Sequence, residues 1–365
     1  MHGFMSSISL TLIPLTVRRE LFEHVNDSED EADCDHDREG TVDPGKNLDT
    51  PSTPPLLFAP MPSDTAGAPA ASSKLKIFLK RLFSTVVLWA IVLGALFSGN
   101  RTAADLAMLI VLNVICFFAL LEFGGLVVAR GGKFFRTYAL TGGFCYLVIS
   151  WWAQSGRPPF DGNVLYGLAL DGPLAGAIVF GLLVRRLFWT DMTGGTAAIG
   201  ATLLGLVYVP WLLNYLQRCY FLPRADGSWW LLYFILVTKA SDMGAYAVGS
   251  LIGRHKMIPR VSPGKTWEGF GGAILVSTAV SLVFAHFAQN YLTGMTVVHA
   301  AILGVLLGVG AVAGDLVESL FKREAGVKDS GRYFPGIGGV LDLVDSLLFN
   351  APIMYAYLVW LMMTK

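Results

Sequence analysis

Residues 314–346 read GDLVESLFKREAGVKDSGRYFPGIGGVLDLVDS, and they place a dense group of charged side chains between two long apolar runs. The run before this stretch is HAAILGVLLGVGAVA (299–313), and the run after it is LLFNAPIMYAYLVWLMM (347–363). Both runs are apolar enough to form lipid-embedded helices, so the carboxylates between them are expected at or inside the edge of a membrane. Ionisable side chains are costly there and usually mark a functional site.

Helical spacing groups these charged side chains into two faces. Asp315, Glu318, Ser319 and Lys322 follow an i, i+3, i+4, i+7 pattern, which places them on one side of a helix. Asp342 and Asp345 are separated by three residues and share a face in the same way. Two acidic faces joined by a basic, glycine-rich loop would suit a divalent metal and a polyphosphate.

The composition is that of a membrane protein. The chain has 365 residues, of which 54% are hydrophobic and only 15% are charged, whereas soluble domains have roughly 25% charged residues. The formal net charge of zero says nothing about nucleic acid, but no array of basic and aromatic residues is present, so no nucleic-acid partner is expected. The four cysteines have neither zinc-ligand spacing nor the pattern of a disulfide framework.

From Leu82 onward the sequence predicts an all-α, polytopic membrane domain over residues 75–365. A membrane-spanning helix needs about 20 mostly apolar residues. Eight or nine spans are expected, the third being short, near residues 82–99, 105–129, 138–153, 164–184, 195–217, 229–250, 270–291, 296–320 and 338–362.

Residues 1–74 have a different composition. An acidic block at 29–37 leads into a segment rich in Pro, Ser, Thr and Ala, which cannot bury enough apolar area to offset its ordering entropy. We therefore expect a disordered tail. Lysines and arginines concentrate in the loops on the same side of the membrane as this tail, which predicts a multi-pass protein of the inner cell membrane with a cytoplasmic N-terminus. The loops 251–269 and 321–337 would then both face the cytoplasm, where nucleotides are found.

A second charged cluster spans residues 237–272. Lys239 and Asp242 lie inside a predicted span, either as a structural ion pair or as part of a site. Ser262, Lys265 and Thr266 precede an apolar helix, and a helix N-terminus with a lysine and hydroxyls nearby is a good anion site. The alternative is a lysine anchored at the lipid headgroups. A P-loop is excluded, because Pro259 occupies the position of a required glycine.

Together the two charged stretches resemble the phosphatidate cytidylyltransferase family (CDP-diacylglycerol synthases), which are multi-pass membrane enzymes. The family signature has the form S-x-x-K-R-x4-K-D-x-G-x-x-x-P-G-H-G-G-x-x-D-R-x-D. The residues that match it here are Ser319, Lys322, Arg323, Lys328, Asp329, Gly331, Pro335, Gly336, Gly338, Gly339, Asp342 and Asp345. The segments 242–246 and 262–269 are also similar to family elements, and Glu122 is a weaker match. The resemblance covers residues 75–365.

The resemblance implies transfer of CMP from CTP to phosphatidate, giving CDP-diacylglycerol and pyrophosphate in phospholipid biosynthesis. It implies catalytic roles for Asp315, Lys322, Arg323, Lys328, Asp329, Asp342 and Asp345. Among them, Asp315, Asp342 and Asp345 are the expected metal ligands, and Mg²⁺ is favoured because carboxylate and phosphate oxygens suit it. Substrate-binding roles are expected for Asp242, Ser262, Lys265, Thr266 and Ser319. A second, monovalent cation and a homodimer stay open.

Two departures from the signature and one rival class leave alternatives. Ile337 replaces the signature histidine and Leu343 the arginine after the first aspartate, which would fit a divergent paralogue with a different lipid phosphate acceptor. An ion-coupled membrane transporter would also carry buried carboxylates in broken helices. The 315–345 pattern has no second copy, however, and its charges gather at one face of the membrane.

Overall fold

The computed structural model describes residues 90, 93–94, 96–97, 99–158, 164–189, 193–223, 225–327, 330–331 and 339–364. The chain divides into two compact units, Met1–Thr65 and Ala66–Lys365, and every described residue belongs to the second. The predicted tail and most of the first predicted span lie outside the described residues. So do the predicted catalytic residues Lys328 and Asp329, and Ile337 of the signature.

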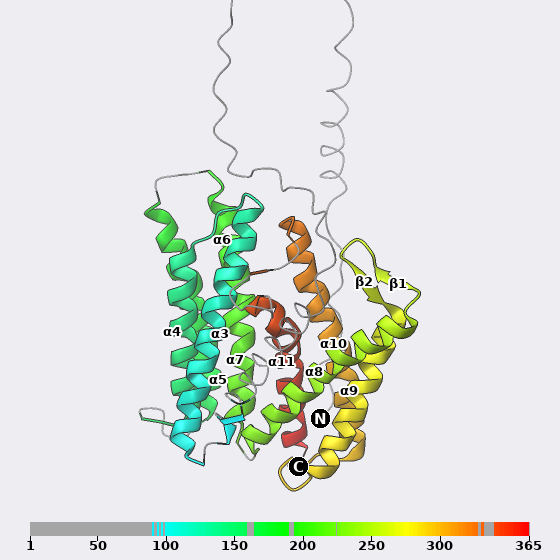
Figure 1. The fold of residues 1–365 in the computed structure, drawn as a ribbon. Helices are drawn as coiled ribbons and strands as arrows, with labels where there is room; N and C mark the ends of the chain where they lie inside the picture. Colours follow the sequence, from blue (N-terminus) through cyan, green and yellow to red (C-terminus); the bar gives the residue numbers. More distant parts are fainter. Residues whose placement is uncertain are drawn as a thin grey trace, which may run out of the picture. The chain divides into compact units, whose positions relative to one another are not determined.

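The described part of the chain is built almost entirely from helices (Figure 1), which confirms the helical class. The helices are α3 (Arg101–Ala129), α4 (Arg136–Gln154), α5 (Val164–Leu187), α6 (Gly195–Leu206), α7 (Leu212–Tyr220), α8 (Gly227–Ile252), α9 (Trp267–Phe287), α10 (Val297–Glu324) and α11 (Val340–Met363). A short π-helical turn, η1 (Val207–Trp211), joins α6 to α7 without a break in the helical path.

Six helices in the described ranges are long and apolar enough to cross a membrane: α3, the continuous α6–η1–α7 segment, α8, α9, α10 and α11. The chain is therefore membrane-embedded, but the expected number of eight or nine spans is not confirmed. Helices α4 and α5 form where spans were predicted, yet they are not among the six. Helix α5 contains three charged residues, Asp171, Arg185 and Arg186.

A β-hairpin follows α8, where the sequence analysis expected only a loop. Strands β1 (Lys256–Ile258) and β2 (Ser262–Thr266) pair antiparallel, with Lys256 opposite Thr266 and Ile258 opposite Ser262. In Figure 1 the hairpin extends from the end of α8 and leads directly into α9. Its ladder gives partners to backbone groups that no helix satisfies, and it fixes the position of Lys265.

Glycines let the helices that carry the charged stretches approach closely. A Cβ atom on Gly244 of α8 would lie 2.6 Å from the carbonyl oxygen of Gly272 in α9. A Cβ atom on Gly314 of α10 would lie 2.7 Å from the carbonyl oxygen of Asp345 in α11. Such small residues permit close backbone packing of membrane helices, and at Gly314 the close packing brings the acidic ends of α10 and α11 together.

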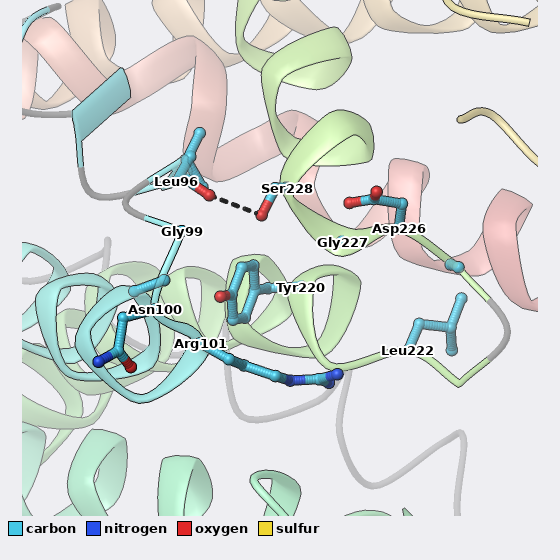
Figure 2. A pocket seen from close by; sticks show the side chains of 11 residues that line it. Leu96, Gly99, Asn100, Arg101, Tyr220, Leu222, Asp226, Gly227 and Ser228 are labelled. Carbon is cyan, nitrogen blue, oxygen red and sulfur yellow. Dashed lines mark hydrogen bonds between the residues drawn. The ribbon is translucent and has the colours of Figure 1, made fainter. Parts of the chain in front are cut away.

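A cavity of about 540 Å³ lies where α3 and α8 begin and α7 ends (Figure 2). Ser228 Oγ donates a hydrogen bond to the carbonyl oxygen of Leu96 at 2.9 Å across it. The two helix N-termini are capped by their own side chains, because Asn100 Oδ1 accepts from Thr102 N at 3.0 Å and Asp226 Oδ1 from Trp229 N at 3.5 Å. These side chains already accept from backbone N–H groups at the two helix N-termini, which are the groups that an anion would bind. We therefore place the functional site elsewhere.

Candidate functional site

Three carboxylates from two helices form a compact group, here called the acidic cluster: Asp315 and Glu318 of α10, and Asp345 of α11. One oxygen of each lies within 4.8 Å of the other two. Asp315 and Glu318 are separated by three residues, so they project from the same side of α10. Glu318 and Asp345 are buried, whereas the Asp315 side chain is 43% exposed. The cluster therefore reaches from the protein interior to an accessible edge.

Lysines surround the acidic cluster but do not neutralise it. Lys265 Nζ lies 2.9 Å from Asp315 Oδ2, and Lys322 Nζ forms ion pairs with Glu318 and, at 2.9 Å, with Asp342 Oδ1. On the neighbouring helix, Lys239 Nζ lies 3.1 Å from Asp242 Oδ2. Within the part of the chain that the structure describes, these contacts join five carboxylates (Asp242, Asp315, Glu318, Asp342, Asp345) and three ammonium groups (Lys239, Lys265, Lys322), so the carboxylates outnumber the lysines by two.

The chemistry of the acidic cluster fits a divalent cation. Its ligand atoms are all carboxylate oxygens, with no histidine or cysteine among them, and Mg²⁺ prefers such hard oxygen ligands. Glu318 Oε1 is buried and has no hydrogen-bond partner among the described residues. A buried carboxylate oxygen is costly without a partner. Asp315, Glu318 and Asp345 could hold the cation, which would supply charge neutralisation for a bound phosphate.

A cavity of about 400 Å³ opens beside the acidic cluster, enclosed by α8, the hairpin, α9 and α10. It brings together residues from both charged stretches of the sequence: Asp242, Ser262, Lys265, Thr266 and Asp315. Ser319, the remaining residue with a predicted substrate-binding role, lies one turn after Asp315 and donates from Oγ to Asp315 Oδ1 at 3.5 Å. Asp315 thus belongs to the acidic cluster and also lines the cavity.

Asp342, a predicted metal ligand, lies beside the acidic cluster and shares Lys322 with Glu318, so its role as a ligand stays a prediction. Asp342 Oδ1 accepts from Lys322 Nζ, and its Oδ2 accepts from the backbone N–H of Gly339 at 3.2 Å. Asp342 lies in the first turn of α11, where its carboxylate accepts from a backbone N–H at the start of the helix. The sequence spacing could have identified Glu318 as a further candidate metal ligand, because it lies on the same helical face as Asp315.

Two other predicted site residues make structural hydrogen bonds. Thr266 Oγ1 accepts from Gly269 N at 3.1 Å and so caps the N-terminus of α9. Arg323 Nε donates to the carbonyl oxygen of Val261 at 3.1 Å, which ties the end of α10 to the hairpin. Both contacts fix the hairpin that carries Lys265 beside the cavity.

Lys239 and Asp242 are joined to α11 by a third residue, Ser346. Lys239 Nζ donates to Ser346 Oγ at 2.9 Å, and Ser346 Oγ donates to Asp242 Oδ2 at 3.1 Å. The backbone N–H of Ser346 also donates to Asp345 Oδ1 at 2.5 Å. The Lys239–Asp242 pair therefore does more than stabilise α8, because it holds the residue next to a member of the acidic cluster.

Glu122 of α3 is a second residue that sequence reasoning undervalued. Its buried carboxylate accepts from Val340 N at 2.9 Å and Leu341 N at 2.8 Å, and from Ser330 Oγ at 3.1 Å. It therefore caps the first turn of α11 from a position 218 residues earlier than Val340 in the chain. The signal was a lone carboxylate inside an apolar span, which usually has a function or a partner.

Fold and site together define a membrane-embedded protein in which a carboxylate cluster borders a cavity whose lining includes Lys265. A sequence profile of the cytidylyltransferase family matches residues 79–361, and the chain belongs to this family. The chain is 38% identical over 194 residues to a phosphatidate cytidylyltransferase of Mycobacterium bovis, an alignment that covers 49% of the chain and 61% of the relative. The resemblance noted from the sequence motifs is thereby confirmed.

Two further relatives show the same pattern of partial coverage. A phosphatidate cytidylyltransferase of Haemophilus influenzae is 45% identical over 127 residues, covering 34% of the chain and 44% of the relative. The uncharacterized protein YnbB of Escherichia coli is 33% identical over 189 residues, covering 51% of the chain and 61% of the relative. The aligned part of the chain thus spans 61% or less of each relative's length.

Proposed function

We propose that the protein is a CTP:phosphatidate cytidylyltransferase, which transfers CMP from CTP to phosphatidate and releases pyrophosphate. The observation that carries this proposal is the shared position of Asp315. This residue belongs to a carboxylate cluster suited to a divalent cation, and it also lines the cavity that contains Lys265 and Ser262. A cation site and an anion site with a common wall are what a reaction between two phosphate compounds requires.

In the proposed reaction, an oxygen of the phosphatidate phosphate attacks the α-phosphorus of CTP. The new P–O bond forms as the bond from the α-phosphorus to the bridging oxygen breaks, and pyrophosphate leaves with that electron pair. Lys265 and Ser262 would hold phosphate oxygens in the cavity, and Asp242 would help to orient the groups around them. Positioning and charge neutralisation supply most of the catalysis in such transfers. No strong general base is needed, because the phosphatidate phosphate is already ionised near neutral pH.

The proposal extends to Mg²⁺ as the cation and to the membrane in which the protein works. Six apolar helices support a bilayer location, and the distribution of lysine and arginine supports an inner membrane with the N-terminus in the cytoplasm. That orientation would give the cavity access to cytoplasmic CTP. A homodimer stays an untested prediction.

The test is an assay with purified full-length protein in detergent, CTP labelled at the α-phosphate, Mg²⁺ and a panel of lipid phosphates. A labelled CDP-lipid formed with phosphatidate is the expected result. A product formed only with another lipid phosphate would instead indicate a divergent paralogue. The panel is needed because Leu343, at the signature arginine position, packs half-buried against the core and supplies no cation. No product with any lipid, together with ion-dependent uptake in proteoliposomes, would favour a transporter.

Lys265→Ala is expected to raise the KM for CTP about tenfold or more, because a hydrogen bond from a charged donor contributes about 1.5–3 kcal/mol. The ammonium group lines the cavity, where it pairs with Asp315 and donates to the carbonyl oxygen of Val312, and in the proposed reaction it would bind a phosphate oxygen of the substrate. Steady-state kinetics with CTP and phosphatidate varied in turn would measure the effect. Lys265→Arg, which keeps the charge, serves as the control. Unaltered KM values for both substrates would assign Lys265 to membrane anchoring.

Deletion of residues 1–70 is expected to leave kcat and KM within about twofold of the full-length values, because terminal segments poor in apolar residues rarely contribute to a packed site. Every residue of the acidic cluster and the cavity lies beyond position 240. Kinetics of the truncated protein in the same detergent would check this. A large loss of activity in a folded truncation would make the tail part of the catalytic unit.

A further inference from the structure

The α6–η1–α7 segment crosses the membrane beside the site but contributes none of the residues discussed so far. Its path is continuous, but the regular α-helical hydrogen-bond pattern changes at the π-helical turn η1, which contains Pro210. Proline has no backbone N–H and clashes with the carbonyl four residues earlier, so it disturbs the regular α-helical ladder. Single π-helical turns are frequent at functional sites. The turn also contains Tyr208, whose side chain is buried.

Aromatic contacts fix the ring of Tyr208 against the helices that build the site. Its centroid lies 5.3 Å from that of Phe321 in α10 and 6.1 Å from that of Phe123 in α3. Phe321 is three residues after Glu318, so the two side chains leave α10 on the same side. Phe123 directly follows Glu122, which caps α11. Tyr208 is therefore packed among elements that position the acidic cluster.

The hydroxyl of Tyr208 has no hydrogen-bond partner among the described residues, although the residue is only 6% exposed. Buried tyrosine hydroxyls usually find a partner, because an unpaired one destabilises the fold. Its ring contact with Phe321, 5.3 Å between centroids, places Tyr208 one helical turn from Glu318 of the acidic cluster. Glu318 Oε1 likewise has no hydrogen-bond partner. An unpaired donor and an unpaired acceptor thus occur in one buried region.

We propose that Tyr208 is a positioning residue of the acidic cluster, whose O–H donates to the Glu318 carboxylate directly or through one water and keeps it turned toward a bound cation. The inference rests on the proposed function in one respect, namely that the acidic cluster holds a divalent cation. Hydrogen bonds to metal-binding carboxylates orient them, and loss of such a partner typically weakens metal binding 10–100-fold. The role differs from that of a ligand, because Tyr208 acts through Glu318.

The test uses Tyr208→Phe in full-length protein in detergent, with Mn²⁺ as the probe and its binding followed by electron paramagnetic resonance. No CTP or lipid is present. The dissociation constant for Mn²⁺ is expected to rise about tenfold. The thermal unfolding midpoint without metal should not fall, because phenylalanine keeps the ring contacts with Phe321 and Phe123. In activity assays, the Mn²⁺ concentration for half-maximal rate should rise while kcat at saturating Mn²⁺ changes much less.

Tyr233→Phe is the matched control. Tyr233 is also a buried membrane tyrosine, but its hydroxyl lies 2.6 Å from Ser281 Oγ, away from the acidic cluster. Removal of the Tyr233 hydroxyl should leave the affinity for Mn²⁺ unchanged. A Tyr208→Phe dissociation constant within about twofold of wild type, well below the effect of losing an orienting partner, would overturn the role of Tyr208 alone. No Mn²⁺ binding by the wild-type protein would overturn both this role and the cation site. A tenfold shift would support Tyr208 even if no CDP-lipid formed.

Discussion

Asp345→Asn is expected to lower kcat for CDP-lipid formation by about a thousandfold, which corresponds to about 4 kcal/mol of transition-state stabilisation. Among the described residues, Asp345 is the member of the acidic cluster that comes from α11, so it brings that helix directly to the cation site. Asparagine has nearly the same shape, but it removes one negative charge and can direct an NH₂ group at the cation. The measurement is single-turnover transfer from labelled CTP to phosphatidate over a range of Mg²⁺ concentrations.

The matched control is Asp226→Asn, which makes the same Asp-to-Asn change at the N-terminus of α8, outside the acidic cluster. Asp226 caps α8 beside the cavity in Figure 2, and asparagine is as good a cap as aspartate. Its activity should equal that of the wild type. Both variants should retain the wild-type thermal unfolding midpoint without metal. Full activity of Asp345→Asn would remove Asp345 from the cation site, whereas activity restored by high Mg²⁺ would show a weakened ligand.

Glu122→Ala is expected to lower the free energy of unfolding by about 3 kcal/mol or more, because it leaves two buried backbone N–H groups without a partner. These are the N–H groups of Val340 and Leu341, which only the Glu122 carboxylate satisfies among the described residues. Loss of the cap should also loosen the first turns of α11 and displace Asp345. We therefore expect a large loss of CDP-lipid formation together with the loss of stability. Denaturant titration in detergent and the labelled-CTP assay would measure the two effects.

Two controls separate the capping role of Glu122 from a direct catalytic one. Glu122→Gln keeps one acceptor oxygen and should lose less stability and less activity than Glu122→Ala. Asn100→Ala removes the exposed cap of α3. It should cost about 1 kcal/mol of stability and leave activity intact, because α3 begins far from the acidic cluster. A Glu122→Ala protein that is inactive but as stable as wild type would show that Glu122 acts on substrate.

The sequence predicted the helices well where apolar length alone decides the outcome. The spans expected at 105–129, 229–250, 270–291, 296–320 and 338–362 correspond to α3, α8, α9, α10 and α11. In lipid, a continuous apolar stretch must satisfy its backbone hydrogen bonds internally, so it forms a helix whatever its neighbours are. The total number of spans was less predictable, because polar residues in α4 and α5 serve internal contacts that the sequence does not reveal.

Part of the candidate site could also be predicted from local spacing. The helical period places Asp315, Glu318 and Lys322 on one face of α10, and the structure has them there as a linked group. The second charged stretch was expected near a phosphate, and the structure brings Lys265, Ser262 and Asp242 to the same cavity as Asp315. Residues 328–329 and 332–338, which come between α10 and α11 in the sequence, lie outside the described part of the chain.

By itself, the sequence determined that this chain forms apolar helices in a membrane and that carboxylates and lysines share helical faces within two charged stretches, because both properties follow from local composition and period. Only the tertiary structure decided which carboxylates meet. Glu318 joins Asp345 while Asp342 pairs with Lys322, and Glu122 caps a helix that begins 218 residues later. The physical reason is that these contacts depend on how closely backbones approach, at positions such as Gly314, and on the rotation of each helix against its neighbours.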